Sequence, residues 1–161
     1  MRLPEESDAS AVAGLANDVA VTRYTARMPH PYGLDDACDF IKVARAGAGE
    51  GTSTPFFIQL KDGCALIGGI GLELGSKQGS AEIGYWLGRD YWNQGYTTEA
   101  VAAVVDFGFD ELKSSVVRGN VVPENTASVR VMEKLGMTVV GHEISPAPAR
   151  AADQNMDIYE M

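Results

Sequence analysis

Residues 93–98, Asn-Gln-Gly-Tyr-Thr-Thr, combine residue types that can bind an anion. An apolar stretch over residues 100–109 follows, so a helix is predicted to begin at about Gly95. The first N–H groups of a helix have no partner within it, and with the helix dipole they form a site for a negatively charged group. Gly95 has no Cβ and lets such a group approach the backbone, and the hydroxyls of Thr97 and Thr98 are further donors. The loop is therefore a candidate phosphate site, although a helix N-terminus that only caps itself has the same pattern.

Other residues whose side chains could bind a metal or react lack the spacing that a site would need. His30 and His142 are isolated, so no metal site is predicted. Residues 68–71, Gly-Gly-Ile-Gly, lack the Lys and Ser/Thr of a nucleotide loop and indicate a bulge or close backbone packing. Cys38 and Cys64 have no Cys-x-x-Cys spacing, which favours a reducing cytoplasm. Cys64 is expected to begin a strand as a small packing residue.

The bulk properties fit one domain over residues 1–161, with ordinary globular composition (45% apolar and 22% charged residues). No apolar run is long enough to cross a bilayer, and the N-terminus lacks a signal-peptide pattern, so no membrane partner is expected. The net charge of -9 argues against nucleic acid, because phosphate binding needs concentrated Lys and Arg. An acidic surface favours cationic partners such as amines, but solubility alone explains it equally well.

The elements that must position these residues follow from periodicity and turn signals. We predict helices over residues 7–19, 34–46, 95–109 and 125–136, and strands over 56–60, 64–74, 80–88, 116–122, 137–144 and 154–161. Ser7 and Asn125 are the predicted N-caps, and Gly136 is the predicted C-cap. Hairpin turns are predicted at 62–63 and over 75–79, and loops over 47–53 and 145–153.

These elements predict a mixed α+β sheet flanked by helices. The first three strands follow one another through short turns and form an antiparallel meander. The third strand is followed by a loop, a helix and a fourth strand, so these two strands should be parallel neighbours. The helix over 95–109 is apolar nearly all round and must be buried across a sheet face.

Three blocks of sequence, in order along the chain, resemble the GNAT acetyltransferases. Residues 82–87, Glu-Ile-Gly-Tyr-Trp-Leu, and 91–100, Tyr-Trp-Asn-Gln-Gly-Tyr-Thr-Thr-Glu-Ala, resemble that family's pyrophosphate-loop region. Residues 125–137 are similar to the Asn-x-x-Ser…Glu-Lys-Leu-Gly-Phe segment of the branch with the ribosomal-protein N-terminal (alanine/serine) acetyltransferases. Residues 29–41 resemble that branch's substrate-side loop and second helix. Three blocks in order are far more specific than one.

The resemblance implies a fold and a reaction. The fold would be a GNAT-like mixed, mostly antiparallel sheet of about six to seven strands with a central splay and about four flanking helices. The reaction would be acetyl transfer from acetyl-CoA, a cosubstrate, to a primary amine by direct attack in a ternary complex, without a metal. The acceptor would be a protein N-terminal α-amino group or a small amine, with polyamines and amino sugars as rivals. A non-catalytic acyl-CoA-binding module is the alternative, and a homodimer is compatible with the family.

The resemblance also implies roles for individual residues. The pantetheine arm would pair with the strand that carries Tyr85, Trp86 and Leu87, and a backbone N–H there would polarise the thioester carbonyl. The pyrophosphate would bind the N–H groups of Gln94, Gly95, Tyr96, Thr97 and Thr98. Asn125 and Ser128 would contact the cofactor from the next helix, and Pro31 and Tyr32 would line the acceptor pocket.

Some positions depart from the family pattern. Trp92 and Thr97 stand at the first and last positions of the loop motif, and the N-terminal strand is reduced to a few residues around Arg2. Many relatives have a Tyr where this chain has Met132, which cannot donate a proton. Ser128, one turn earlier, is the expected substitute, although a capping hydroxyl explains it as well. Glu82 is the expected base, although a solvated strand residue or a water chain is an equal alternative.

Overall fold

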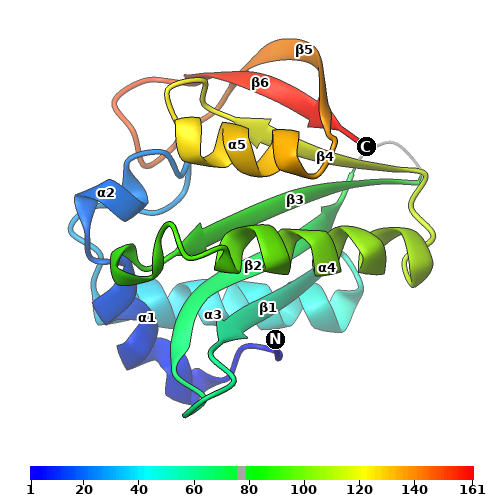
Figure 1. Cartoon of the computed structure of the whole chain (residues 1–161). Helices are drawn as coiled ribbons and strands as arrows, with labels where there is room; N and C mark the ends of the chain where they lie inside the picture. Colours follow the sequence, from blue (N-terminus) through cyan, green and yellow to red (C-terminus); the bar gives the residue numbers. More distant parts are fainter. Residues whose placement is uncertain (76–78) are drawn as a thin grey trace.

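The computed structural model describes residues 1–75 and 79–161 and contains a six-stranded sheet with the order β1-β2-β3-β4-β6-β5 (Figure 1). The strands are β1 Ser53–Gln59, β2 Leu66–Leu74, β3 Ser80–Leu87, β4 Val116–Val121, β5 Thr138–Ser145 and β6 Gln154–Glu160. The helices are α1 Ala9–Ala16, α2 Val19–Thr22, α3 Leu34–Glu50, α4 Tyr96–Asp110 and α5 Thr126–Lys134, with 3-10 turns η1 Glu6–Asp8 and η2 Arg89–Tyr91. Neighbouring strands are antiparallel except β3 and β4, which are parallel. The predicted mixed α+β sheet is confirmed. Residues 76–78 of the turn predicted over 75–79 lie outside the described residues.

The helix predicted over residues 7–19 is wrong as one element. The chain forms η1, then α1, and begins α2 after Asp18, whose Oδ1 accepts a hydrogen bond from Ala20 N–H at 2.7 Å. Asp18 thus caps a second start, which its short acceptor side chain favours. Ser7 lies within η1 and does not cap α1.

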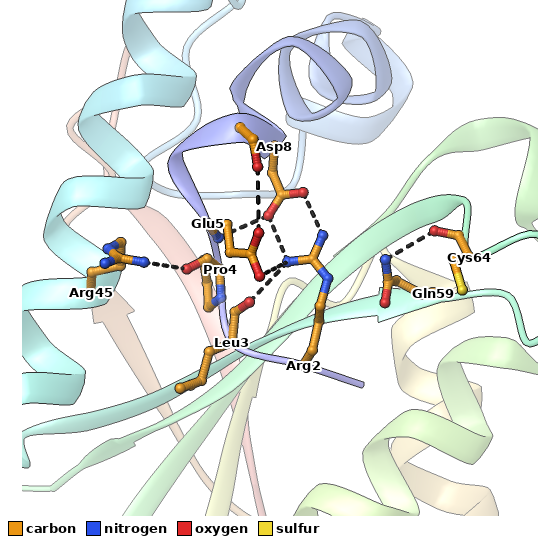
Figure 2. Close-up of polar contacts among 9 residues, drawn as sticks. Arg2, Leu3, Pro4, Glu5, Asp8, Arg45, Gln59 and Cys64 are labelled. Carbon is orange, nitrogen blue, oxygen red and sulfur yellow. Dashed lines mark hydrogen bonds and ion pairs between the residues drawn. The ribbon is translucent and has the colours of Figure 1, made fainter.

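A backbone bridge to β1 and an ion pair within the N-terminal segment fix the first residues of the chain, and Figure 2 shows the ion pair. Arg2 forms an isolated antiparallel bridge with Phe57 of β1, so the expected N-terminal strand is indeed reduced to a trace. The Arg2 guanidinium donates to both carboxylate oxygens of Asp8, at 2.8 and 2.5 Å, and Glu5 N–H donates to Asp8 at 2.8 Å. The hydrogen bond from Arg2 lowers the pKa of the buried Asp8 carboxyl, outweighing the effect of burial.

Helix α3 is longer than predicted. It continues through Gly47 and Gly49 to Glu50, so the loop predicted over residues 47–53 is wrong in its first half. Each interior glycine costs about 1 kcal/mol of helix propensity, and packing of Ala37, Ile41 and Ala44 on the core holds the helix together. The helix ends at Gly51, which has the left-handed φ of 70° typical of a helix terminus.

The hairpin between β1 and β2 turns over more residues than the two predicted. Leu60 N–H donates to Ala65 O at 3.0 Å, and the turn between them includes Gly63 and Cys64, both with positive φ. Cys64 is therefore an exposed turn residue and does not begin the strand. Close packing explains the glycines of β2, since a Cβ on Gly68 would lie 2.4 Å from Trp86 O.

The two faces of the sheet carry different helices (Figure 1). Helices α4 and α5 lie on one face, where the core cluster joins Ala81, Ile83 and Leu87 of β3 to residues of α4 and to Met132 of α5. Helices α1 and α3 lie on the other face, where Trp86 packs with Phe57. Odd-numbered side chains of β3 thus face α4 and α5, and Trp86 points the other way, as strand alternation requires.

Candidate active site

Strands β3 and β4 pair only where both begin. Residues 80–82 pair with residues 116–118, and the remainder of both strands, all within the described residues, is unpaired between them. Gly75 N–H donates to Ser80 O at 2.8 Å and Gly88 N–H donates to Ile67 O at 2.9 Å, so even-numbered residues of β3 direct their backbone polar groups to β2. By alternation, the N–H and C=O groups of Ile83 and Tyr85 face the gap beside β4. The splay that was predicted is therefore present, with a free backbone edge.

Downstream of β3, the chain enters α4 through the candidate phosphate loop. Gly95 is the N-cap of α4 with φ 87°, and Asn93 also has positive φ. The first helical hydrogen bond runs from Glu99 N–H to Gly95 O at 3.0 Å, so the N–H groups of residues 96–98 precede it. An added Cβ on Gly95 would meet no atom within 4 Å, which leaves open space against the loop. Gln94 directs its side-chain amide back to Asp90 O at 2.9 Å.

The N-terminus of α5 lies across the splay from β3. Asn125 caps this helix as predicted, because its Oδ1 accepts from Ser128 N–H at 3.3 Å. The C-cap is Leu135, and the predicted Gly136 follows it with a positive φ of 79°. Met132 is 1% exposed, and its Cε would lie 2.5 Å from a Cβ on Gly119 of β4. Ile83 of β3 also borders that position, so Met132 fills the space where β3 and β4 begin to diverge.

The hydroxyl of Tyr85 is buried beside Ser128. Burial raises the pKa of Tyr85, and a side-chain hydrogen bond with Ser128 opposes that shift. The contact lies outside normal hydrogen-bond geometry, and the Tyr85 oxygen is covered from solvent.

On the opposite face of the sheet, Glu82 borders a cavity of about 220 Å³. The other polar lining residues include Arg118, Asn120 and Glu143. Loss of water around the carboxylate raises the pKa of Glu82, and Glu73 and Glu143 raise it further, against Arg27 and Arg118. Although part of its surface is exposed, the carboxylate thus lies among like charges. It stands at the last paired position of β3, where the splay begins.

Of the two residues predicted to line an acceptor pocket, one is buried in the core and the other is exposed. Tyr32 is 4% exposed and packs with Trp86, and its hydroxyl donates to Asp36 O at 3.3 Å. Burial, with Asp36, raises the pKa of Tyr32 to about 12. The structure therefore places Tyr32 in the core and leaves Pro31 beside it exposed.

Arg150 joins the loop after β5 to the segment after α2, and no sequence signal pointed to it. Its guanidinium donates to the backbone carbonyls of Thr22, Thr25 (2.6 Å) and Met28 (2.8 Å), and Ala149 N–H donates to Ala26 O at 3.0 Å. The loop after β5 is thereby attached to the segment after α2. A lone Arg in a Pro/Ala-rich loop gives no periodic pattern, which is why the sequence did not reveal it.

No group of three or more His, Cys, Asp or Glu in the described part of the chain is arranged to hold a metal ion. No helix in residues 1–75 or 79–161 is long and apolar enough to cross a membrane.

Comparisons with known proteins agree with this geometry. Residues 1–138 match the family model described as "Acetyltransferase (GNAT) domain". The uncharacterized N-acetyltransferase p20 of Bacillus licheniformis is 32% identical over 142 residues, 88% of this chain and 79% of that protein. An acetyltransferase (GNAT family) structure from Bacillus anthracis aligns with TM-score 0.85 and 27% identity, covering 99% of this chain and 92% of that one. Mycobacterium smegmatis RimJ, solved with CoA-disulfide, aligns with TM-score 0.88 and 22% identity over 99% and 79% of the two chains.

Proposed function

The chain belongs to the GNAT acetyltransferases and is an acetyl-CoA-dependent enzyme, and we propose that it acetylates a primary amine by direct attack within a ternary complex. The observation that carries this proposal is the unpaired edge of β3, which is followed directly by the N-terminus of α4. The first N–H groups of that helix can bind an anion. The acceptor is a protein N-terminal α-amino group or a small amine.

The free edge and the loop fit the two parts of acetyl-CoA that the fold must hold. Of the expected strand residues Tyr85, Trp86 and Leu87, we assign the backbone of Tyr85 to the pantetheine arm, because its N–H and C=O groups face the gap beside β4. The backbone of Trp86 faces β2, and Leu87 O accepts a hydrogen bond from the Trp92 indole N–H at 2.8 Å, so these two positions do not fit that role. The thioester supplies an activated acetyl group, and a backbone N–H from this edge polarises its carbonyl.

The pyrophosphate is assigned to the loop that starts α4. Gln94, Gly95, Tyr96, Thr97 and Thr98 provide N–H groups, and the open space at Gly95 leaves room for a phosphate against the backbone. Asn125 and Ser128 approach the same arm from α5. The side-chain amide of Gln94 already binds Asp90 O, so only its N–H is assigned to the phosphate.

Glu82 is the proposed base. It lies at the apex of the splay on the face opposite α4 and α5, within the cavity that an amine can enter. Its raised pKa makes Glu82 a stronger base than an ordinary carboxylate, which suits proton uptake near neutral pH. Asn120 Nδ2 donates to Glu143 at 3.0 Å, which leaves the Glu82 carboxylate as the cavity group suited to accept a proton from the amine.

The carboxylates of the cavity favour a small cationic amine as a second candidate acceptor. Glu82 and Glu143 both line the cavity, and the two arginines that lower the pKa of Glu82 also pair with other carboxylates, Arg118 with Glu160 at 2.5 Å and Arg27 with Glu73 at 2.9 Å. Two carboxylates in one cavity attract a substrate that carries more than one positive charge. Pro31 and the loop held by Arg150 are proposed to border the entry.

The test is a panel of amines assayed for thiol release from acetyl-CoA. It should contain N-terminal peptides, polyamines and amino sugars, and the acceptor that raises release above background identifies the substrate class. Thermal shift gives an independent check, because acetyl-CoA and CoA should raise the melting temperature and ATP should not. Protection by ATP alone would contradict the assignment of the loop.

A further inference from the structure

Gly84 lies in the middle of β3, and neither packing nor backbone conformation requires a glycine there. Its φ is not positive, and a Cβ added to it would meet no atom within 4 Å. Among the strand glycines of residues 1–75 and 79–161, it alone has such open space; a Cβ on Gly69 or Gly119, for example, would lie 2.7 or 2.5 Å from a side-chain atom. Glycine weakens a strand interior, and one that packing does not explain often marks the close approach of a ligand.

The open space at Gly84 lies on the face of the sheet from which the amine is proposed to enter. Strand alternation puts Gly84 on the same face as Glu82 and Trp86, opposite α4 and α5. Because a strand rises about 3.4 Å per residue, Glu82 and Trp86 each lie about 7 Å from Gly84 along β3. Gly84 therefore stands between the proposed base and a buried indole.

Side chains on both sides of Gly84 turn away from it. The Trp86 indole lies over Gly69 of β2, where its Nε1 would contact an added Cβ. Asn120 of β4 stands where the partner of Gly84 would be if the two strands stayed paired, and its side chain donates to Glu143 of β5 at 3.0 Å. The backbone of Gly84 is thus exposed, although β3 is an interior strand of the sheet.

The backbone on either side of Gly84 forms the unpaired edge of β3. The N–H and C=O groups of Ile83 and Tyr85 face the gap beside β4. A thioester carbonyl that is polarised by an N–H of this edge lies next to Gly84, and an amine attacks it from the face that carries Glu82. The carbon that bears the amine must then lie over the Gly84 backbone.

Resting on the proposed function, we infer that Gly84 is a specificity-determining residue, whose missing side chain leaves room for the substituent on the carbon that bears the acceptor amine. A methyl group at position 84 would take that room. An amine on an unsubstituted carbon carries only hydrogens there and needs less space. The site is thereby open to amines on substituted carbons, such as the α-amino group of an N-terminal residue that has a side chain.

The test compares Gly84→Ala with wild type on two pairs of acceptors that differ only by methyl groups on the amine-bearing carbons. The pairs are peptides that begin with Gly or with Ala, and 1,4-diaminobutane with 2,5-diaminohexane. For whichever pair is acetylated, kcat/KM for the substituted amine should fall about 10- to 100-fold, the effect of displacing a reactant by about 1 Å. The loss for the unsubstituted amine should be smaller.

Two further readouts separate this role from a structural one. The KM for acetyl-CoA should not change, and neither should the slow hydrolysis of acetyl-CoA without an amine, because water carries no substituent. The melting temperature of Gly84→Ala should stay the same or rise, since alanine suits a strand interior better than glycine.

Gly49→Ala is the matched control. Gly49 of α3 also lacks a positive φ and also has open space where its Cβ would lie. This variant should keep or gain stability and should leave every rate unchanged. Equal kcat/KM for Gly84→Ala and wild type, equal losses for both members of a pair, or a raised KM for acetyl-CoA would overturn the inference. A wild-type protein that acetylates no amine at all would instead contradict the proposed function, so the two failures are distinguishable.

Discussion

Replacing Gly95 by valine tests the phosphate loop. At φ 87°, a residue with a Cβ is strained by about 1–2 kcal/mol, and in a protein of this size that lowers the melting temperature by about 2–8 °C. The added side chain also projects into the open space beside the first N–H groups of α4. Loss of one or two charge-assisted hydrogen bonds to phosphate, about 1.5–3 kcal/mol each, should raise the KM for acetyl-CoA by at least tenfold.

Gly51→Val is the matched control. Gly51 also has positive φ (70°), also has open space where its Cβ would lie, and ends α3 away from the loop. It should lose similar stability, measured by thermal unfolding, with an unchanged KM for acetyl-CoA in steady-state assays. Equal KM values for Gly95→Val and wild type, with the stability loss present, would refute the placement of phosphate at this loop.

Three further changes test other parts of the structure. Glu82→Gln should lower kcat and abolish the acidic limb of the pH–rate profile. In wild type the rate falls as pH falls through the raised pKa of Glu82, because the base becomes protonated. An unchanged acidic limb in the variant would exclude Glu82 as the base. Asp8→Asn should reduce stability by about 1–3 kcal/mol at pH 7, the cost of breaking a charge-assisted contact with Arg2. The pKa of Asp8 is lowered in the folded state, so its contribution to the free energy of unfolding is present above the unfolded-state pKa and is lost as pH falls through the folded-state pKa. Urea melts should therefore give wild type and Asp8→Asn the same free energy of unfolding in acid. Arg150→Met should raise the KM for the amine and leave the KM for acetyl-CoA unchanged, because it releases the loop held on Thr25 and Met28 and not the β3 edge. A rise in both KM values would contradict that separation.

The sequence predicted those parts of the site that depend on local backbone chemistry. The strand–loop–helix–strand order implied parallel β3 and β4, and their partial pairing confirms the splay. Asn125 caps α5 as its residue type indicates, and Gly136, one residue past the C-cap Leu135, has the positive φ typical of a helix end. Such features depend on a few neighbouring residues, and their spacing is visible in the chain.

Features that depend on tertiary packing were not predictable in the same way. Gly47 and Gly49 signalled a loop, but core contacts of α3 outweighed their low propensity. Tyr32 was expected to face an acceptor, and the sequence could not show that its ring enters the core beside Trp86. Arg150 contacts carbonyls more than 120 residues away in the chain, a separation that no local pattern reports.

The splay explains how the proposed base can act on a carbonyl held at the edge of β3. Glu82 and Tyr85 are three residues apart on the same strand, and strand alternation places them on opposite faces of the sheet. A continuous sheet would separate them by a closed layer of hydrogen bonds between β3 and β4. Because pairing stops at Glu82 and Arg118, the layer is open just beyond Glu82. An amine entering from the cavity can therefore meet a carbonyl held at the edge of β3. This opposed geometry requires no covalent enzyme intermediate, which is why direct attack is the mechanism we propose.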